Sequence, residues 1–323
     1  MEKWGIEKLK TQGGLRTVQE GGRDDLFLVC ASYEPRAVAA AELLGSQYRA
    51  KRGIIYVNKE FLEGPPKDKT KSSLAHLENI LKNHCDVVVT AEGSWLDPKV
   101  QLDSLKEALL TNSDETLEAL ITLDTTGFNR EALLAAAALL RLRFPKSHMR
   151  ALYVSPKDHG EWLSRGFRCI RNVMGFAGVQ RSSQPTVLAV LSGFEPERTL
   201  KIIEEHEPIK VLMGIGDPPT EQRFLERNIN EQKLVLASQD VEKFSFPADS
   251  IKGCWECLEN LLKPFFVDYN LILAPMSTKL STLAVFATAL RHPEIQITYC
   301  LPGEYNIDSY STGADALFID EIP

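Results

Sequence analysis

The sequence has no apolar stretch long enough to cross a bilayer. Its longest uninterrupted apolar run is Ala132–Leu140, which is about half the length of a membrane-spanning helix. The first residues also lack the apolar core of a signal peptide. We therefore expect a soluble, cytoplasmic protein with no membrane partner.

The sequence has few cysteines and no excess of positive charge. The six cysteines are scattered and several lie in apolar runs, which favours reduced core thiols over a disulfide framework. Lys and Arg number 37 against 44 Asp and Glu, for a net charge of −7. General attraction to an extended nucleic-acid duplex is therefore not expected, and any site for an anionic ligand must be local.

Common catalytic and metal-binding motifs are missing as well. The sequence has no P-loop, no Gly-x-Ser-x-Gly and no His-Glu-x-x-His. Its one Cys-x-x-Cys, Cys254 to Cys257, stands alone on a predicted amphipathic helix without a second pair at zinc spacing. We predict no bound metal and no cofactor, and catalytic residues cannot be named.

What the sequence does contain is an internal repeat. With 323 residues and 44% hydrophobic residues, the chain is long enough for two domains. Three anchors recur in one order: Phe27–Arg36 resembles Leu188–Arg198, a Leu-rich strand before a polar turn recurs, and Tyr-x-x-Pro ends a later strand in both halves. The recurring later segments are Leu120–Gly127 with Leu271–Lys279, and Arg150–Pro156 with Gln296–Pro302. This order predicts a tandem duplication.

Within each half, short apolar strands alternate with helical stretches. Continuous apolar runs of this length are typical of buried parallel strands. The predicted strands are 27–30, 53–57, 86–90, 120–123 and 152–154, then 187–191, 211–215, 234–237, 271–274 and 295–299. The predicted fold class is α/β, a tandem duplication of two Rossmann-like, mainly parallel, doubly wound sheets. We place an N-terminal extension, a short helix and Gly-rich tether, at 1–24, the first half at 25–160, a linker at 161–185 and the second half at 186–323.

Polar turns follow the first predicted strand of each half. A ligand crevice in an open α/β sheet lies beyond the carboxyl ends of its strands, so these turns are candidate sites. Proline and a capping Ser or Glu suit any helix start, which is the structural explanation. The functional alternative is that hydroxyls, helix amides and arginines face an anionic ligand, with each Glu binding a sugar hydroxyl. The candidate residues are Ser32, Glu34, Arg36, Ser192, Glu195 and Arg198.

Polar turns also follow the fourth predicted strand of each half. Hydroxyls, free amides and a lysine at a helix N-terminus form a phosphate cradle, although the same residues serve as ordinary N-caps. Asp124 and Glu34 could also converge as paired carboxylates if their strands are neighbours. The candidate residues are Asp124, Thr125, Thr126, Ser277, Thr278 and Lys279.

With these turns in view, the chain resembles the CARF-like group of CRISPR-associated Rossmann-fold sensors of prokaryotic defence. The resemblance rests on Ser32 with Ser192, and on 125–127 with 277–279. It implies a cyclic-oligonucleotide ligand at a two-fold junction of Rossmann-like units. The first half departs from the pattern by lacking the lysine, and the chain carries no appended helix-turn-helix or nuclease domain.

Three functions stay open at this point. The first is an intracellular nucleotide- or oligonucleotide-binding sensor with an anionic, nucleotide-like ligand and a separate partner protein or effector. The second is an enzyme, a phosphodiesterase, hydrolase or transferase, acting on a nucleotide or phosphorylated metabolite. The third is a protein-interaction scaffold. Fold alone does not choose among them.

Overall fold

The computed structural model describes residues 4–6, 8–11, 18, 21–110, 118–238 and 240–323. The chain divides into two compact units. Unit 1 comprises Met1–Gly160 and Ile307–Pro323, and unit 2 is the continuous segment Glu161–Asn306. No helix among these residues is long and apolar enough to span a membrane.

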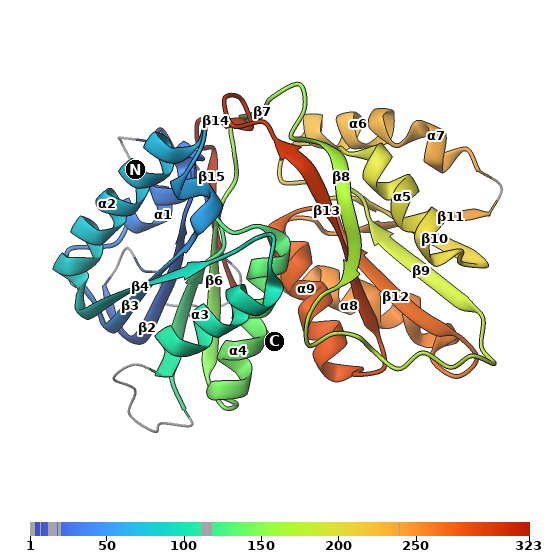
Figure 1. The fold of residues 1–323 in the computed structure, drawn as a ribbon, viewed down its shortest axis with the longest axis horizontal. Coiled ribbons are helices and arrows are strands. Elements are labelled where there is room, and N and C mark those ends of the chain that lie inside the picture. Colours follow the sequence, from blue (N-terminus) through green and yellow to red (C-terminus); the bar gives the residue numbers. More distant parts are fainter. Residues whose placement is uncertain (1–3, 7, 12–17, 19–20, 111–117, 239) are drawn as a thin grey trace. The chain divides into compact units, whose positions relative to one another are not determined.

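Unit 1 is built on a seven-stranded sheet (Figure 1). All its neighbouring strands run parallel except the pair β15 and β6, which is antiparallel. In order across the sheet the strands are β1 (Lys8–Thr11), β15 (Ala316–Ile322), β6 (His148–Val154), β5 (Leu120–Asp124), β2 (Gly22–Ala31), β3 (Tyr48–Asn58) and β4 (Cys85–Gly93).

The helices of unit 1 cover this sheet with apolar faces. The Leu- and Ala-rich sequence of α4 favours a helix strongly, and the Asn129 side chain caps it by accepting a hydrogen bond from the Ala132 amide. The helical elements are η1 (Pro35–Val38), α1 (Ala39–Glu42), η2 (Lys59–Leu62), α2 (Lys67–His84), α3 (Pro98–Leu110) and α4 (Arg130–Arg143).

Unit 2 is built on a six-stranded sheet. Its strands are parallel except β8, which runs antiparallel to β13. In order they are β11 (Val241–Phe246), β10 (Lys210–Gly216), β9 (Thr186–Leu191), β12 (Asn270–Pro275), β13 (Gln296–Tyr305) and β8 (Ser164–Asn172). The helical elements are α5 (Pro196–His206), α6 (Gln222–Glu231), α7 (Lys233–Leu236), α8 (Ile251–Leu262), η3 (Lys263–Phe265) and α9 (Lys279–Arg291).

The two sheets share one strand order. From one edge, each runs third, second, first, fourth and fifth parallel strand, and then one antiparallel strand; in unit 1, β1 follows as a seventh strand. The first five positions follow the order of a Rossmann-type sheet, whose direction of winding reverses between the first and fourth strands. The predicted α/β class, with two Rossmann-like and mainly parallel sheets, is confirmed.

The antiparallel strands connect the two units in an unexpected way. β8 directly follows the strands of unit 1 in the chain but pairs with β13 of unit 2, and β15 follows the strands of unit 2 but pairs with β6 of unit 1. The connections that carry this exchange include β7 (Asp158–His159) and β14 (Ser311–Thr312), which pair with each other. The structure thus differs from the predicted boundaries: part of the expected linker 161–185 is strand β8, and the last residues belong to unit 1.

Three further local predictions differ from the structure. Residues 234–237 were expected as a strand, but Lys233–Leu236 form helix α7 with Leu234 exposed, and the edge strand follows as β11. β4 was expected to be buried, but it lies at the sheet edge with Val87 exposed. Lys8–Thr11, part of the expected N-terminal helix and tether, form strand β1; most of the rest of that extension lies outside the described residues.

Candidate functional site

All the candidate residues lie at the carboxyl ends of neighbouring strands. In unit 1 the turns after β2 and β5 are adjacent, and in unit 2 the turns after β9 and β12 are adjacent. These are the places where the strand order reverses, and where Rossmann-type sheets bind ligands. The structure therefore brings the predicted turns together in pairs, one pair in each unit.

Arg36 lies at the centre of a buried cluster in unit 1. Its Nη2 is 2.8 Å from Oε2 of Glu34, and its Nη1 donates to the Val154 carbonyl at the end of β6. The Ser311 hydroxyl from β14 donates to the same carboxylate at 2.8 Å. The ring of Tyr153 lies 5.7 Å from the guanidinium.

Unit 2 repeats this cluster around Arg198. Its Nη1 is 3.2 Å from Oε1 of Glu195, and its Nη2 donates to the Cys300 carbonyl in β13. The Ser164 hydroxyl, from the exchanged strand β8, donates to the Glu195 carboxylate. The ring of Tyr299 lies 5.7 Å from the guanidinium.

These clusters hold their charges inside the protein. Arg36 and Arg198 are 3% and 2% exposed, and each carboxylate is 7% exposed. Burial disfavours the charged guanidinium, but the adjacent Glu34 or Glu195 carboxylate and neighbouring tyrosines together outweigh it and raise the arginine pKa. The four side chains therefore present almost no surface to a ligand, and their role in binding one stays a prediction.

The hydroxyl groups of the turn after β5 also make their hydrogen bonds inside the protein. The Thr125 hydroxyl donates to the Leu152 carbonyl at 2.9 Å, and the Thr126 hydroxyl accepts from the Val154 amide at 3.1 Å. Both threonines are fully buried. Their hydroxyls tie the turn to β6, so neither faces solvent.

Asp124, in the same turn, is a buried carboxyl. Its Oδ1 accepts from the Thr126 amide at 3.0 Å, and its Oδ2 has no hydrogen-bond partner. Burial raises the pKa of Asp124 to about 6, against the lowering effects of the Thr126 hydrogen bonds and of Arg36. Arg36 is the charged neighbour that affects the Asp124 pKa. The pairing of Asp124 with Glu34 stays a prediction.

At the carboxyl ends of the strands, each unit has one close backbone-to-backbone approach at a glycine. A Cβ on Gly127 would lie 2.2 Å from the Cys30 carbonyl oxygen, and a Cβ on Gly193 would lie 2.2 Å from that of Met276. No other residue fits such an approach. In unit 2 this contact sets the Ser192–Gly193 turn directly beside the turn that carries Ser277.

The turn after β12 leads into helix α9. The Thr278 hydroxyl accepts from the Ser281 amide at 3.1 Å and donates to the Ala248 carbonyl at 2.8 Å. Ser277, Thr278 and Lys279 are each partly exposed. Thr278 is the N-cap of α9, and Lys279 is its first residue.

Sequence reasoning missed two sets of residues at these edges. Asn228 and Gln232, from the α6 segment, hold the Ser192 turn: the Ser192 hydroxyl is 2.9 Å from Oδ1 of Asn228, and both amides donate to the Gly193 carbonyl. Asn129 and Arg130 occupy in α4 the N-cap and first positions that Thr278 and Lys279 occupy in α9. The first half therefore has a cation at the helix start after all, and an Asn directly before an apolar helix was the signal for its position.

Metal ligands and reactive thiols do not gather at either edge. Within the described ranges, no group of three or more His, Cys, Asp or Glu side chains could hold a metal ion. All six cysteines are free thiols. Cys254 and Cys257 lie on helix α8, where burial raises the pKa of both.

Comparison with known proteins gives little beyond this. No family model and no curated protein matches the chain. Among solved structures it is similar to AtPrR2 with NADP+ and (+)pinoresinol, at 10% identity over 77% of this chain and 88% of that one, with a TM-score of 0.24. It is also similar to an N-terminal ketoreductase from a macrolactin assembly line, at 10% identity over 75% and 50% of the two chains, with a TM-score of 0.21. No function follows from likenesses this distant.

Proposed function

We propose that the chain is a nucleotide-binding regulatory protein, and that the phosphates of its ligand bind in unit 2 at the turn 276–279. A change in the bound protein would be passed to a partner protein, as in the sensor predicted from the sequence. Any link to antiviral defence stays a prediction.

The observation that carries this proposal is the difference in charge between the two helix starts. From Pro275 to Thr282 the unit 2 turn carries one charged residue, Lys279, together with four hydroxyl-bearing and three apolar residues, and no carboxylate. The matching turn of unit 1 has Arg130 between the buried carboxyls of Asp124 and Glu131. An anion is stabilised at a helix N-terminus with a nearby cation and is repelled by carboxylates, so unit 2 is favoured.

Two features add to this support. The turn lies where the strand order reverses, which is the usual ligand crevice of such sheets. Helix α9 is 13 residues long, so its aligned peptide dipoles give the N-terminus a partial positive charge. Ser277, directly before the N-cap, is partly exposed and carries a hydroxyl of the kind that donates to phosphate oxygens.

A thermal-shift screen tests the proposal. The panel comprises pyrophosphate, AMP, ADP, ATP and cyclic oligonucleotides. A ligand held at about a hundred times its dissociation constant stabilises the folded protein by about 2.7 kcal/mol. A shift with nucleotides and pyrophosphate supports a phosphate site, whereas no shift with any member of the panel contradicts it and favours a scaffold.

A further inference from the structure

A groove of about 580 Å³ lies in unit 1 and is lined by residues of α2, of the segment around the end of η2, and of β4. Because β4 is an edge strand and contributes its carboxyl end, the groove lies at the edge of the sheet and not where the strand order reverses. Its volume is within the range of small-molecule sites. The lining includes Leu62, Glu63, Lys67, Lys71, Leu74 and Glu92.

Four charged side chains of both signs line this groove. Lys67 and Lys71 belong to α2, Glu63 follows η2, and Glu92 lies near the end of β4. All four residues are exposed. None of the four side chains forms an ion pair or a hydrogen bond with another described residue. The groove therefore holds two cations and two carboxylates that do not pair with one another.

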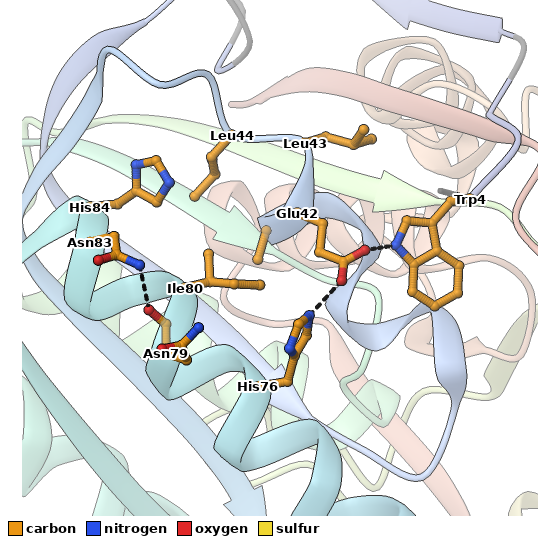
Figure 2. Close-up of a pocket in the computed structure, with 10 residues that line it drawn as sticks. Trp4, Glu42, Leu43, Leu44, His76, Asn79, Ile80, Asn83 and His84 are labelled. Atoms are coloured by element: carbon orange, nitrogen blue, oxygen red, sulfur yellow. Dashed lines mark hydrogen bonds and ion pairs between the residues drawn. The ribbon is translucent and has the colours of Figure 1, made fainter. Parts of the chain in front are cut away.

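Elsewhere on α2, charged groups have partners inside the protein. Lys69 pairs with Asp308 at 3.1 Å. A separate cavity is lined by the C-terminal half of the helix, and there Nε2 of His76 is bonded to Glu42, which also accepts from the Trp4 indole N–H (Figure 2). The groove at the N-terminal half differs because its charged groups lack such partners.

The helix side of the groove favours an anionic group. Lys67 and Lys71 are four residues apart on one face of α2, where like charges repel each other. Lys67 is also the first residue of this 18-residue helix, so the positive end of the helix dipole lies beside it. A carboxylate bound between the two lysines would offset both effects.

The other lining elements favour a cationic group and an apolar one. Glu63 and Glu92 attract an ammonium group and repel a ligand that carries only negative charge, such as a free phosphate. Leu62 and Leu74 are partly buried, pack against the core of unit 1 and line the groove as well. The lining thus complements a ligand with both charges and an apolar body.

From these observations we propose that the groove binds a short zwitterionic peptide with apolar side chains. Its terminal carboxylate would lie at Lys67 and Lys71, and its ammonium group at Glu63 and Glu92. An apolar side chain would pack on the two leucines. The volume of the groove is larger than a single amino acid needs, which favours a dipeptide. This site is independent of the nucleotide site proposed in unit 2.

Matched dipeptides test the proposal on the full chain. Leucyl-leucine carries both charges, its N-acetyl form only the carboxylate, its C-terminal amide only the ammonium group, and the doubly blocked form neither. Binding is measured by NMR titration through the methyl signals of Leu74, assigned by their loss in Leu74→Ile. We expect leucyl-leucine to shift these signals, and blocking either end to weaken binding about three- to fivefold. Free leucine should bind more weakly than leucyl-leucine, because it fills less of the groove.

Variants at exposed positions assign the two ends of the peptide. Lys71→Gln should weaken leucyl-leucine binding about three- to fivefold but should not weaken binding of the C-terminal amide, which has no carboxylate. Glu92→Gln should weaken leucyl-leucine binding by a similar factor but not binding of the N-acetyl form. Lys82→Gln, on α2 but outside the groove, is the control and should bind as wild type does.

Four results would overturn the proposal. The first is the absence of any shift of the Leu74 signals with leucyl-leucine, and the second is equal binding of leucyl-leucine and its doubly blocked form. The third is tighter binding of free leucine than of the dipeptide. The fourth is a loss in Lys71→Gln that is the same for leucyl-leucine and for its amide, because the lysine would then not contact the carboxylate.

Discussion

At the residue scale, the repeated Glu–Arg clusters explain why both halves carry Glu-Pro followed by Arg. Each arginine joins the start of its helix to a carbonyl of the fifth parallel strand. Each glutamate accepts a hydrogen bond from the hydroxyl of a serine, Ser311 or Ser164. Ser311 and Ser164 belong to the segments exchanged between the units. The clusters thus fasten the exchanged segments in place.

Removing the charge of Arg198 should be strongly destabilising. Arg198→Met would leave the Glu195 carboxylate buried without its ion-pair partner, which typically costs about 3–5 kcal/mol. Adding Glu195→Gln should recover part of this loss, because no buried charge then remains. Urea unfolding of wild type and both variants measures the effect. A loss of less than about 1 kcal/mol in the free energy of unfolding for Arg198→Met would show that the cluster does not stabilise the packing of the exchanged segment.

Asp124 should make stability depend on pH. Its pKa is raised by burial to about 6 in the folded protein, from 3.8 for the unperturbed group. Between these values the folded protein keeps a proton that the unfolded chain has released, so this group lowers stability as the pH rises through that window. Above about pH 6 the carboxyl is ionised in both the folded and the unfolded protein, so its unfavourable contribution to the free energy of unfolding no longer changes with pH.

The variant Asp124→Asn removes this dependence and can keep the hydrogen bond from the Thr126 amide. The free energy of unfolding of the variant, relative to wild type, should therefore rise from about pH 4 to about pH 6 and then level off. Urea unfolding across this range is the measurement. A difference that is flat with pH would mean that Asp124 is ionised in the folded protein throughout.

At the element scale, the close packing of the strand-end turns depends on single glycines. Gly193→Ala places a Cβ 2.2 Å from the Met276 carbonyl oxygen, so the backbone must shift, and we expect a loss of more than about 2 kcal/mol. Gly253→Ala, in helix α8, is the control: its closest neighbour is a Pro247 ring carbon at 3.1 Å, and alanine is the better helix former. Thermal unfolding that ranks the two variants equally would contradict the close approach.

Element type was predictable from the sequence where apolar runs are long, and not where they are short. The strand around Leu188 and the helices around Leu134 and Leu283 agree with their patterns. Leu234–Ala237 is too short for periodicity to separate strand from helix, and its neighbour Lys233 begins a helical turn. The positions of the candidate turns could also be predicted from the sequence. The direction of their hydroxyls could not, because it depends on hydrogen-bond partners such as Leu152 and Asn228 that are distant in sequence.

At the scale of the whole molecule, the two mainly parallel Rossmann-like sheets were predicted from the repeat, but the exchange of edge strands was not. β8, from the predicted linker, is the antiparallel neighbour of β13 in the second half, and β15, from the second half, is the antiparallel neighbour of β6 in the first. Pairing partners of this kind are set by tertiary contacts, and residues such as Arg165 and Arg168 made the β8 segment resemble a solvated linker. The exchange makes the structural boundary differ from the boundary of the repeat.

The exchange predicts which fragment folds alone. The fragment 161–306 contains all six strands of the unit 2 sheet, so it should unfold cooperatively in urea. The fragment 186–323, cut at the repeat boundary, lacks β8 and carries the unpaired β15, so it should aggregate or unfold without a cooperative transition. The opposite ranking of the two fragments would contradict the assignment of β8 to unit 2.

The central claim, a phosphate site at the start of α9, is tested most directly by titrating pyrophosphate and ADP into three proteins by calorimetry. Arg130→Ala removes the matching cation of unit 1, and Lys279→Ala removes the proposed ligand. The account predicts that Lys279→Ala loses a charge-assisted hydrogen bond of about 1.5–3 kcal/mol, or about ten- to a hundredfold in affinity, while Arg130→Ala binds as wild type does. Equal affinities for Lys279→Ala and wild type, or a loss confined to Arg130→Ala, would contradict it.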